Sequence, residues 1–405
     1  MNNWKSFSSA PHRLFFFAGA IQGVLAISWW LYDLAGKSFN VFPIVYWPIA
    51  SIWIHAFLMI YGFFPFFIFG FLMTAAPNWV NGKKVKPAYF IPGFLLMAVG
   101  MLLFYFALLS GQDVMFFSIC LYLLGWVIST WALLDVILTS SSSTRDKVHA
   151  YIVIGNVLIG WLGAFAYLLW LLNGQSIWLR SSLTAGIWLF LLPIFLSVSH
   201  RMIPFFSSTA LQNYEPKRPY SPLFMLLAGM AAHAFLSMAG EIRYLWVSDL
   251  PMAVLSFYLS SLWQFGRSLS VRLLAMLHIG FAWLAIALML YSAQSLTAFI
   301  SGHVWLAIAP LHALTIGYFS SMVLAMVTRV TLGHSGRLLR ADKTVWLLFL
   351  GFQFAAIARI LGDFPLVRAS SFYIIAALIW LVSFVLWDVK HVPIYWKQRI
   401  DGKQG

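Results

Sequence analysis

Histidine is the ionisable residue that recurs inside the apolar stretches of this sequence. The six histidines placed there are His55, His200, His233, His278, His303 and His312. An ionisable side chain is costly in a bilayer, so each one needs a partner or a ligand. Neutral imidazole is a good ligand for haem iron and for copper. The residue types therefore predict a haem or copper site, and polar packing between helices is the alternative for each histidine.

Depth along the predicted helices separates these histidines. At about 1.5 Å per residue, His312 is predicted near the middle of the membrane, and His278 and His233 within reach of that level. His55 is predicted in the outer half, and His200 towards the cytoplasmic end. We expect copper to be held where His200 or His233 joins another imidazole, because copper prefers several imidazoles in one small site.

Other polar residues are fewer. Intramembrane acids are nearly absent apart from Asp135 near a helix end, whereas a proton-coupled transporter usually carries acids near mid-membrane. Arg201 and Arg329 lie near cytoplasmic helix ends, where they either snorkel to water or hold haem propionates. Glycines inside the runs are expected to allow close helix packing, with close approach of a flat porphyrin as the alternative. They are Gly62, Gly70, Gly280 and Gly317.

The elements that must position these residues are apolar helices. The 405 residues are 62% hydrophobic and 9% charged, whereas a soluble domain is roughly a quarter charged. Lipid must therefore solvate most of the surface. At about 20 residues per crossing, the length holds about twelve spans and no soluble module.

The apolar runs, which short polar segments separate, predict an all-α membrane protein with about twelve transmembrane helices in one bundle. We expect one transmembrane domain, 1–405, with cytoplasmic tails 1–13 and 390–405. The predicted spans are 14–34, 48–76, 88–110, 114–139, 148–172, 183–206, 222–240, 246–265, 272–293, 296–330, 343–362 and 370–389.

Basic residues predict the orientation. With the N-terminus in the cytoplasm, the outer side receives only Lys37, Arg180, Arg243 and Arg368, and Arg359 lies inside a span. The other 20 of the 25 basic residues then face the cytoplasm, which is the positive-inside bias. Both termini are therefore predicted to be cytoplasmic. The net charge of +14 is scattered between apolar runs, so we expect no nucleic-acid partner.

The single cysteine, Cys120, excludes a disulfide within the chain and a Cys-x-x-Cys-His attachment of haem. Any haem is therefore expected to be held non-covalently.

Several short sequence blocks between residue 11 and about residue 340 are specific when taken together, and in this order they resemble the NnrS family of bacterial membrane proteins. They are Pro11-His12-Arg13, His55-Ala56 followed by Gly62-Phe63, Gly70-Phe71-Leu72-Met73-Thr74-Ala75-Ala76-Pro77-Asn78-Trp79, Arg201-Met202-Ile203-Pro204-Phe205-Phe206, Leu277-His278-Ile279-Gly280-Phe281-Ala282-Trp283-Leu284, His312-Ala313-Leu314-Thr315-Ile316-Gly317, Met326-Val327-Thr328-Arg329 and Leu332-Gly333-His334-Ser335-Gly336-Arg337. Many relatives carry a second histidine and an acidic residue where this chain has Phe57 and Leu58.

This resemblance implies a multi-pass protein of the bacterial inner membrane that binds haem b and copper and takes part in nitric oxide metabolism or tolerance of nitrosative stress. His55, His278 and His312 occupy the histidine-bearing blocks and are the preferred ligands. They are expected to share one interior, with at least two of them on haem iron. Arg201 and Arg329 occupy the arginine-bearing blocks and join them as cofactor-binding residues. Expected partners are the lipid bilayer, haem, nitric oxide and a respiratory electron donor.

Three functions from different classes stay open from the sequence. The first is a haem and copper redox or gas-handling protein, which includes an oxidoreductase acting on nitric oxide. The second is a transporter or channel whose histidines are structural or line a path. The third is an assembly partner of respiratory complexes.

Overall fold

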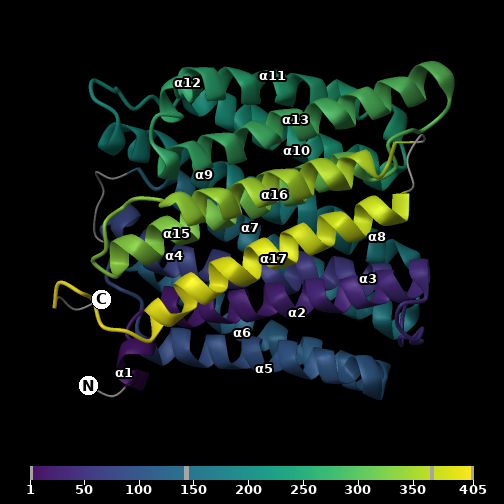
Figure 1. Cartoon of the computed structure of the whole chain (residues 1–405), viewed down its shortest axis with the longest axis horizontal. Coiled ribbons are helices and arrows are strands. Elements are labelled where there is room, and N and C mark those ends of the chain that lie inside the picture. Colours follow the sequence, from purple (N-terminus) through teal and green to yellow (C-terminus); the bar gives the residue numbers. More distant parts are fainter. Residues whose placement is uncertain (1–2, 141–145, 365–368, 403–405) are drawn as a thin grey trace. The chain divides into compact units, whose positions relative to one another are not determined.

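The structure, a computed structural model, describes residues 3–140, 146–364 and 369–402 of the chain (Figure 1). Within these ranges it is helical and contains no strand. Twelve of the helices described there are long and apolar enough to cross a membrane. The predicted class, an all-α membrane protein with about twelve spans, is therefore confirmed.

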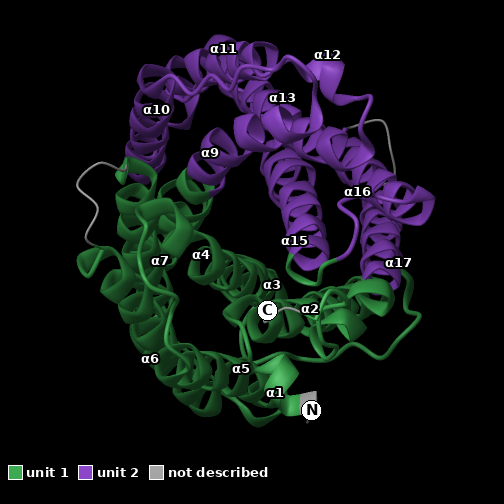
Figure 2. Ribbon diagram, turned by 90° about the vertical axis from the view of Figure 1, so that its left-hand side faces the viewer, with its two compact units in different colours: residues 1–194, 334–336, 388–405 green, residues 195–333, 337–387 purple. Residues whose placement is uncertain are grey.

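The chain divides into two compact units, shown in different colours in Figure 2. Unit 1 comprises residues 1–194, 334–336 and 388–405, and unit 2 comprises residues 195–333 and 337–387. The single domain expected from the sequence remains a prediction.

Unit 1 contains the first five spans and the beginning of the sixth. A short helix, α1 (Asn3–Phe7), precedes them. The spans are α2 (Pro11–Phe39), Ser51–Val80, α5 (Pro87–Ser110), α6 (Gln112–Leu138), α7 (Val148–Asn173) and Ser176–Ala210. The second span consists of α3 (Ser51–Phe57), η1 (Leu58–Phe63) and α4 (Phe64–Val80), and the sixth of α8 (Ser176–Thr184), η2 (Ala185–Leu191) and α9 (Leu192–Ala210).

Unit 2 contains most of α9 and the remaining spans. They are α10 (Tyr220–Ala239), η3 (Ile242–Tyr244) with α11 (Trp246–Leu262), α13 (Arg272–Ser301), Ala309–His334, α16 (Lys343–Leu361) and α17 (Ala369–Tyr395), whose end belongs to unit 1. The tenth span consists of α14 (Ala309–His312), η4 (Ala313–Ser320) and α15 (Ser321–His334), and a short helix, α12 (Phe265–Ser268), precedes α13.

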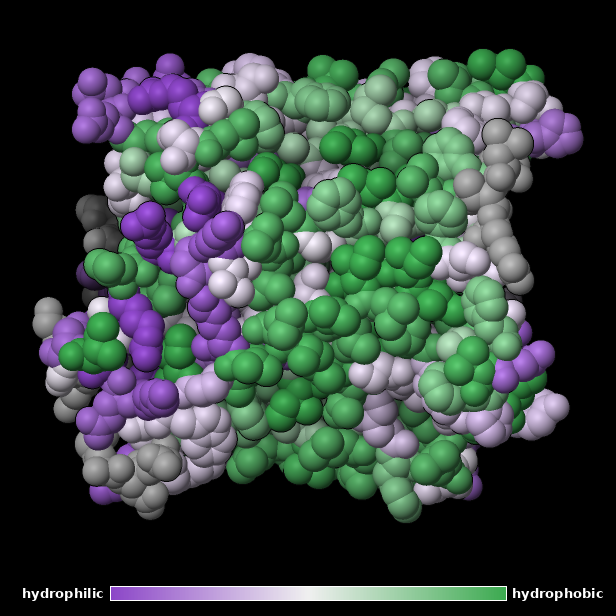
Figure 3. Space-filling view, viewed as in Figure 1, coloured by the Kyte–Doolittle hydropathy of each residue, from purple (hydrophilic) through white to green (hydrophobic). Residues whose placement is uncertain are grey.

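Helix surfaces outside the two cores are apolar. Leu102, Phe106 and Leu109 on α5 are 59%, 61% and 79% exposed, although such side chains avoid water. Hydrophobic side chains cover the middle of the helices in Figure 3, and hydrophilic ones gather near helix ends. These surfaces fit contact with lipid.

Helix ends follow the turn residues of the sequence in most places. Asn81 after α4 and Gly174 after α7 have left-handed backbones, with φ of 55° and 68°, as expected for residues that end a helix. The boundary predicted at 294–295 is wrong, because α13 continues to Ser301 and ends at Gly302. His303 therefore lies in an exposed loop rather than in a span.

Three spans contain a π-helical segment, and they are the second, sixth and tenth. Two of these segments, η1 and η4, follow His55 and His312 within the same span. Each also carries a fully buried tyrosine six residues after the histidine, Tyr61 or Tyr318. The Tyr61 hydroxyl donates to the carbonyl of Ser182, 2.7 Å away. Because π-helical turns often mark functional sites, both histidines stay candidates for ligand binding.

The packing interpretation of the glycines is confirmed. A Cβ added at Gly317 would lie 2.5 Å from the Trp283 ring, and one at Gly70 would lie 2.8 Å from the Phe16 ring. A Cβ added at Gly280 would lie 3.0 Å from the Met322 sulfur.

We propose that both termini face the cytoplasm, as the basic residues predict; Arg145, Arg368 and Lys403 lie outside the described residues. With Cys120 replaced by alanine, a cysteine at exposed Lys83 or Lys217 should escape an impermeant maleimide in intact cells. A cysteine at Tyr46, which is 94% exposed, should react. Labelling of the first two positions and protection of the third would reverse the orientation.

Candidate functional site

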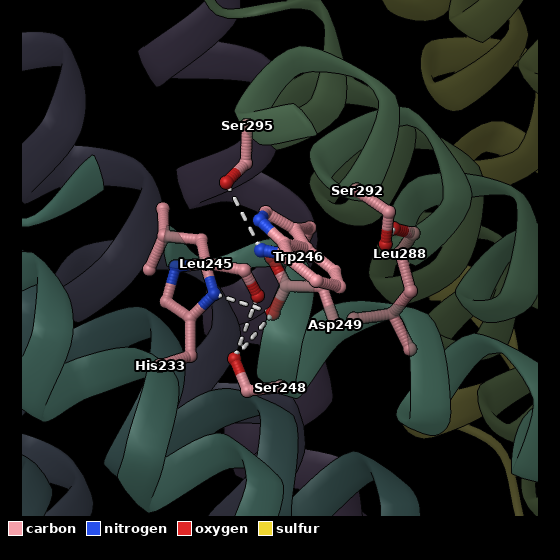
Figure 4. A network of polar contacts seen from close by, with 8 residues as sticks. All are labelled: His233, Leu245, Trp246, Ser248, Asp249, Leu288, Ser292 and Ser295. Carbon is pink, nitrogen blue, oxygen red and sulfur yellow. Dashed lines mark hydrogen bonds and ion pairs between the residues drawn. The ribbon is translucent and has the colours of Figure 1, made fainter. Parts of the chain in front are cut away.

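A histidine and an aspartate form a buried pair in unit 2 (Figure 4). His233 Nδ1 on α10 lies 2.7 Å from Asp249 Oδ1 on α11, and their side chains are 2% and 0% exposed. The Ser248 hydroxyl lies 3.1 Å from the same carboxylate oxygen. The Tyr291 ring on α13 meets the His233 ring edge-on, with centroids 5.3 Å apart.

Helix geometry favours a negative charge on one member of this pair. Asp249 lies in the first turn of α11, where the helix dipole favours an anion. Asp249 Oδ2 is buried and makes no hydrogen bond within the described part of the chain. The pair can therefore share or pass a proton, or His233 can act as a metal ligand oriented by a carboxylate.

The expectation that acids are nearly absent from the spans is wrong. Asp249, Asp33 and Asp388 are 0%, 5% and 8% exposed, each within a membrane-length helix. Asp33 accepts hydrogen bonds from Lys37 and Trp47. Both oxygens of Asp388 are buried without a hydrogen bond among the described residues. Asp249 lies inside the predicted span 246–265. The apolar residues around it dominated the hydropathy of that span, so the aspartate was not singled out.

His278 and Arg329 each contact the last turn of α9. His278 is 1% exposed, and its Nε2 lies 3.1 Å from the Ser207 hydroxyl. Arg329 donates to the Thr209 hydroxyl over 3.2 Å and lies 3.8 Å above the Phe206 ring. This preferred histidine and this arginine therefore contact the same turn of α9, and Arg329 is 9% exposed rather than extended to water.

His278 and His312 lie at different depths. Gly280 on α13 is level with Met322, and Trp283 is level with Gly317, so α13 runs antiparallel to the tenth span. His278 is then about eleven residues, or roughly 16 Å, from the level of His312. These two histidines do not face one metal ion. His312 lies at the start of its span rather than at mid-membrane, because the loop before it falls later than predicted.

The remaining predicted residues are dispersed. His200 Nε2 lies 3.0 Å from the Pro219 carbonyl, a contact that suits packing of the adjacent loop, and Arg201 is half-buried on α9. His312 Nδ1 contacts the Ile308 carbonyl of its own turn at 3.1 Å. His55 belongs to unit 1, where its ring stacks on Trp30 with centroids 4.3 Å apart. Its convergence with the other two preferred ligands remains a prediction.

No group of three or more His, Cys, Asp or Glu side chains suited to a metal ion occurs among the described residues. The copper site expected at His200 or His233 stays a prediction without such a cluster around it. Haem iron can be held by a single axial imidazole, and His278 or His233 can supply one.

Twelve apolar helices with buried histidine, aspartate and arginine side chains define a polytopic α-helical membrane protein with an intramembrane polar site. The chain matches the family described as NnrS protein over residues 6–399 and belongs to that family. A comparison with curated proteins gave no match.

Proposed function

We propose that this NnrS-family protein binds haem b non-covalently within the membrane and acts in nitric oxide metabolism or in tolerance of nitrosative stress. The observation that carries the proposal is that His278 and Arg329 both contact the last turn of α9, at Ser207 and Thr209. One supplies an axial imidazole and the other a cation for a propionate. Membership of the family agrees with this function.

The residues fit a haem group in type and spacing. The Ser207 hydroxyl orients the His278 ring, as a partner of a metal-bound imidazole does. From the level of His278, Arg329 lies about 8 Å further along α15, and its guanidinium is held by Thr209 and Phe206. A bound haem would supply an iron centre that takes nitric oxide, while the apolar helices exclude water from it.

The test is the absorption spectrum of the purified protein. The wild type should show a Soret band and reducible alpha bands, and His278→Ala should lose most of the Soret absorbance per protein because an axial ligand is gone. Arg329→Leu should weaken haem retention and keep the band position. His303→Ala changes an exposed loop histidine and should leave the spectrum unaltered.

Two results would contradict the proposal. A folded wild type without a Soret band would remove the haem function. A haem spectrum unaltered in His278→Ala but abolished in His55→Ala or His312→Ala would keep the function and move the ligand.

A transporter is the second candidate function, and the buried His233–Asp249 pair favours it. Paired ionisable groups inside a membrane often relay protons. A colourless folded protein that carries protons into liposomes, and loses this activity in Asp249→Asn, would support transport instead.

A further inference from the structure

One face of α2 carries polar residues into the interior of unit 1. Gln22, Trp29 and Asp33 follow one another at intervals of seven and four residues, so they lie on the same face of the helix. We call these three residues the α2 stripe. It begins near the middle of α2 and ends one turn before Lys37. Polar groups are costly in lipid and in a dry protein interior, so each group of the stripe needs a hydrogen-bond partner.

The end of the α2 stripe near Lys37 has its partners and reaches the surface. Asp33 accepts hydrogen bonds from Lys37 Nζ over 2.9 Å and from Trp47 Nε1 over 2.6 Å. Lys37 also donates to the Ser51 hydroxyl over 2.7 Å. The Lys37 side chain is 46% exposed, so this network connects the stripe to solvent.

The deeper part of the stripe lacks such partners. Gln22 is 3% exposed, and its Nε2 makes no hydrogen bond among the described residues. The Trp29 indole nitrogen and the Tyr105 hydroxyl on α5 are also buried without a hydrogen bond in this part of the chain. Leaving a buried polar group unpaired costs about 1–3 kcal/mol. Three such groups along one path indicate bound molecules that supply the missing partners.

Gln22 and Tyr105 border the same place between α2, η1 and α5. A Cβ added at Gly62 in η1 would lie 2.6 Å from Gln22 Nε2 and 3.2 Å from the Met101 sulfur, so these residues are at one level. Tyr105 lies one turn beyond Met101. Its hydroxyl is beside the Gln22 side chain but does not form a hydrogen bond of ordinary geometry with it. A polar contact of this kind suits a bridging water.

The direction of α5 places Tyr105 between the two unpaired nitrogens. Gln112 follows α5, and its side chain donates to the Pro48 carbonyl in the loop after α2 over 3.5 Å, so the two helices run parallel. At about 1.5 Å per residue, Tyr105 is then roughly 6 Å and Trp29 roughly 10 Å beyond the level of Gln22. One or two waters about 2.8 Å apart span each of these steps.

The chemistry of the path favours a small uncharged molecule that both donates and accepts. Gln22 Nε2 and Trp29 Nε1 only donate, whereas the Tyr105 hydroxyl does both. The sequence contains no Asp, Glu, Lys or Arg at 14–32, 51–63 or 87–110. An ion in the deeper part of this path would therefore lack a compensating charge from these segments.

We propose that a file of water molecules runs along the α2 stripe, from the Lys37 end to Gln22. It gives unit 1 a path for water from one surface to the middle of α2. The path is separate from His278 and Arg329 and does not rest on the proposed function.

The test is oxidation of methionine by hydroxyl radicals that an X-ray pulse generates from water, measured by mass spectrometry of the detergent-purified protein. The radicals react close to where they form, so a buried methionine is oxidised only beside bound water. Met101 is 2% exposed, and Met97, one turn earlier on α5, is 0% exposed. Met101 should be oxidised several-fold faster than Met97, which is the internal control.

Variants link the water to the stripe. In Gln22→Leu/Tyr105→Phe the oxidation rate of Met101 should fall to that of Met97, because the inner polar groups are gone. Size-exclusion elution reports folding, and Tyr105→Phe alone, at a half-buried position, should lower the rate part of the way.

Three results would overturn the proposal. Equal slow oxidation of Met101 and Met97 in the wild type would mean a dry interior, with Gln22 and Tyr105 bonded directly to each other. Equal fast oxidation would mean that the helices open. A Met101 rate unaltered in both variants would mean that other groups hold the water.

Discussion

Replacement of Asp249 by alanine should lower the free energy of unfolding by about 3–5 kcal/mol, because it leaves His233 buried without its partner. The two side chains are 0% and 2% exposed, so water cannot compensate. His233→Ala should have a similar effect. The measurement is equilibrium unfolding in mixed micelles.

A double-mutant cycle makes this prediction specific. In His233→Phe/Asp249→Leu the pair is replaced by apolar groups, and stability should return to near the wild-type value. Glu241→Ala is the control, since Glu241 is 44% exposed and pairs with Arg243 over 3.4 Å; exposed pairs contribute little. Additive losses in the double variant would show that the two residues are not coupled.

Replacement of Gly125 by leucine should force α5 and α6 apart. A Cβ at Gly125 would lie 2.7 Å from the Met97 backbone nitrogen and 2.8 Å from the Gly93 carbonyl. Backbone atoms cannot turn away as a side chain can, so we expect a loss of about 1–3 kcal/mol or more. Thermal unfolding followed by size-exclusion chromatography would show it as a lower midpoint.

The same substitution at Gly155 is the matched control. Gly155 lies within α7, where no atom is within 4 Å of an added Cβ. Gly155→Leu should leave the midpoint unchanged or raise it, because glycine weakens a helix interior. Equal losses at both positions would mean that the close approach of α5 and α6 does not limit stability.

The spans themselves could be predicted from the sequence, because a helix surrounded by lipid must present an apolar surface along its whole length. Twelve helices were expected, and twelve are found among the described residues. The failure at the ninth span has a physical cause. Gln294 lies in the gap predicted at 294–295, but its amide donates to the carbonyls of Trp305 and Ala307, so a polar residue remains inside α13.

Which polar residues meet was decided by the tertiary structure alone. The sequence identified His233 and His278 as side chains that are costly in lipid, but Asp249 was not singled out. It could not show that His233 pairs with Asp249 or that His278 contacts Ser207. Hydropathy is summed along one helix, so it locates the ends of that helix and thereby the depth of each residue in the membrane. It does not determine the rotation of that helix or its neighbours. The approach of Gln22 to Gly62 depends on both, and only the packing of α2 against η1 brings those two residues together.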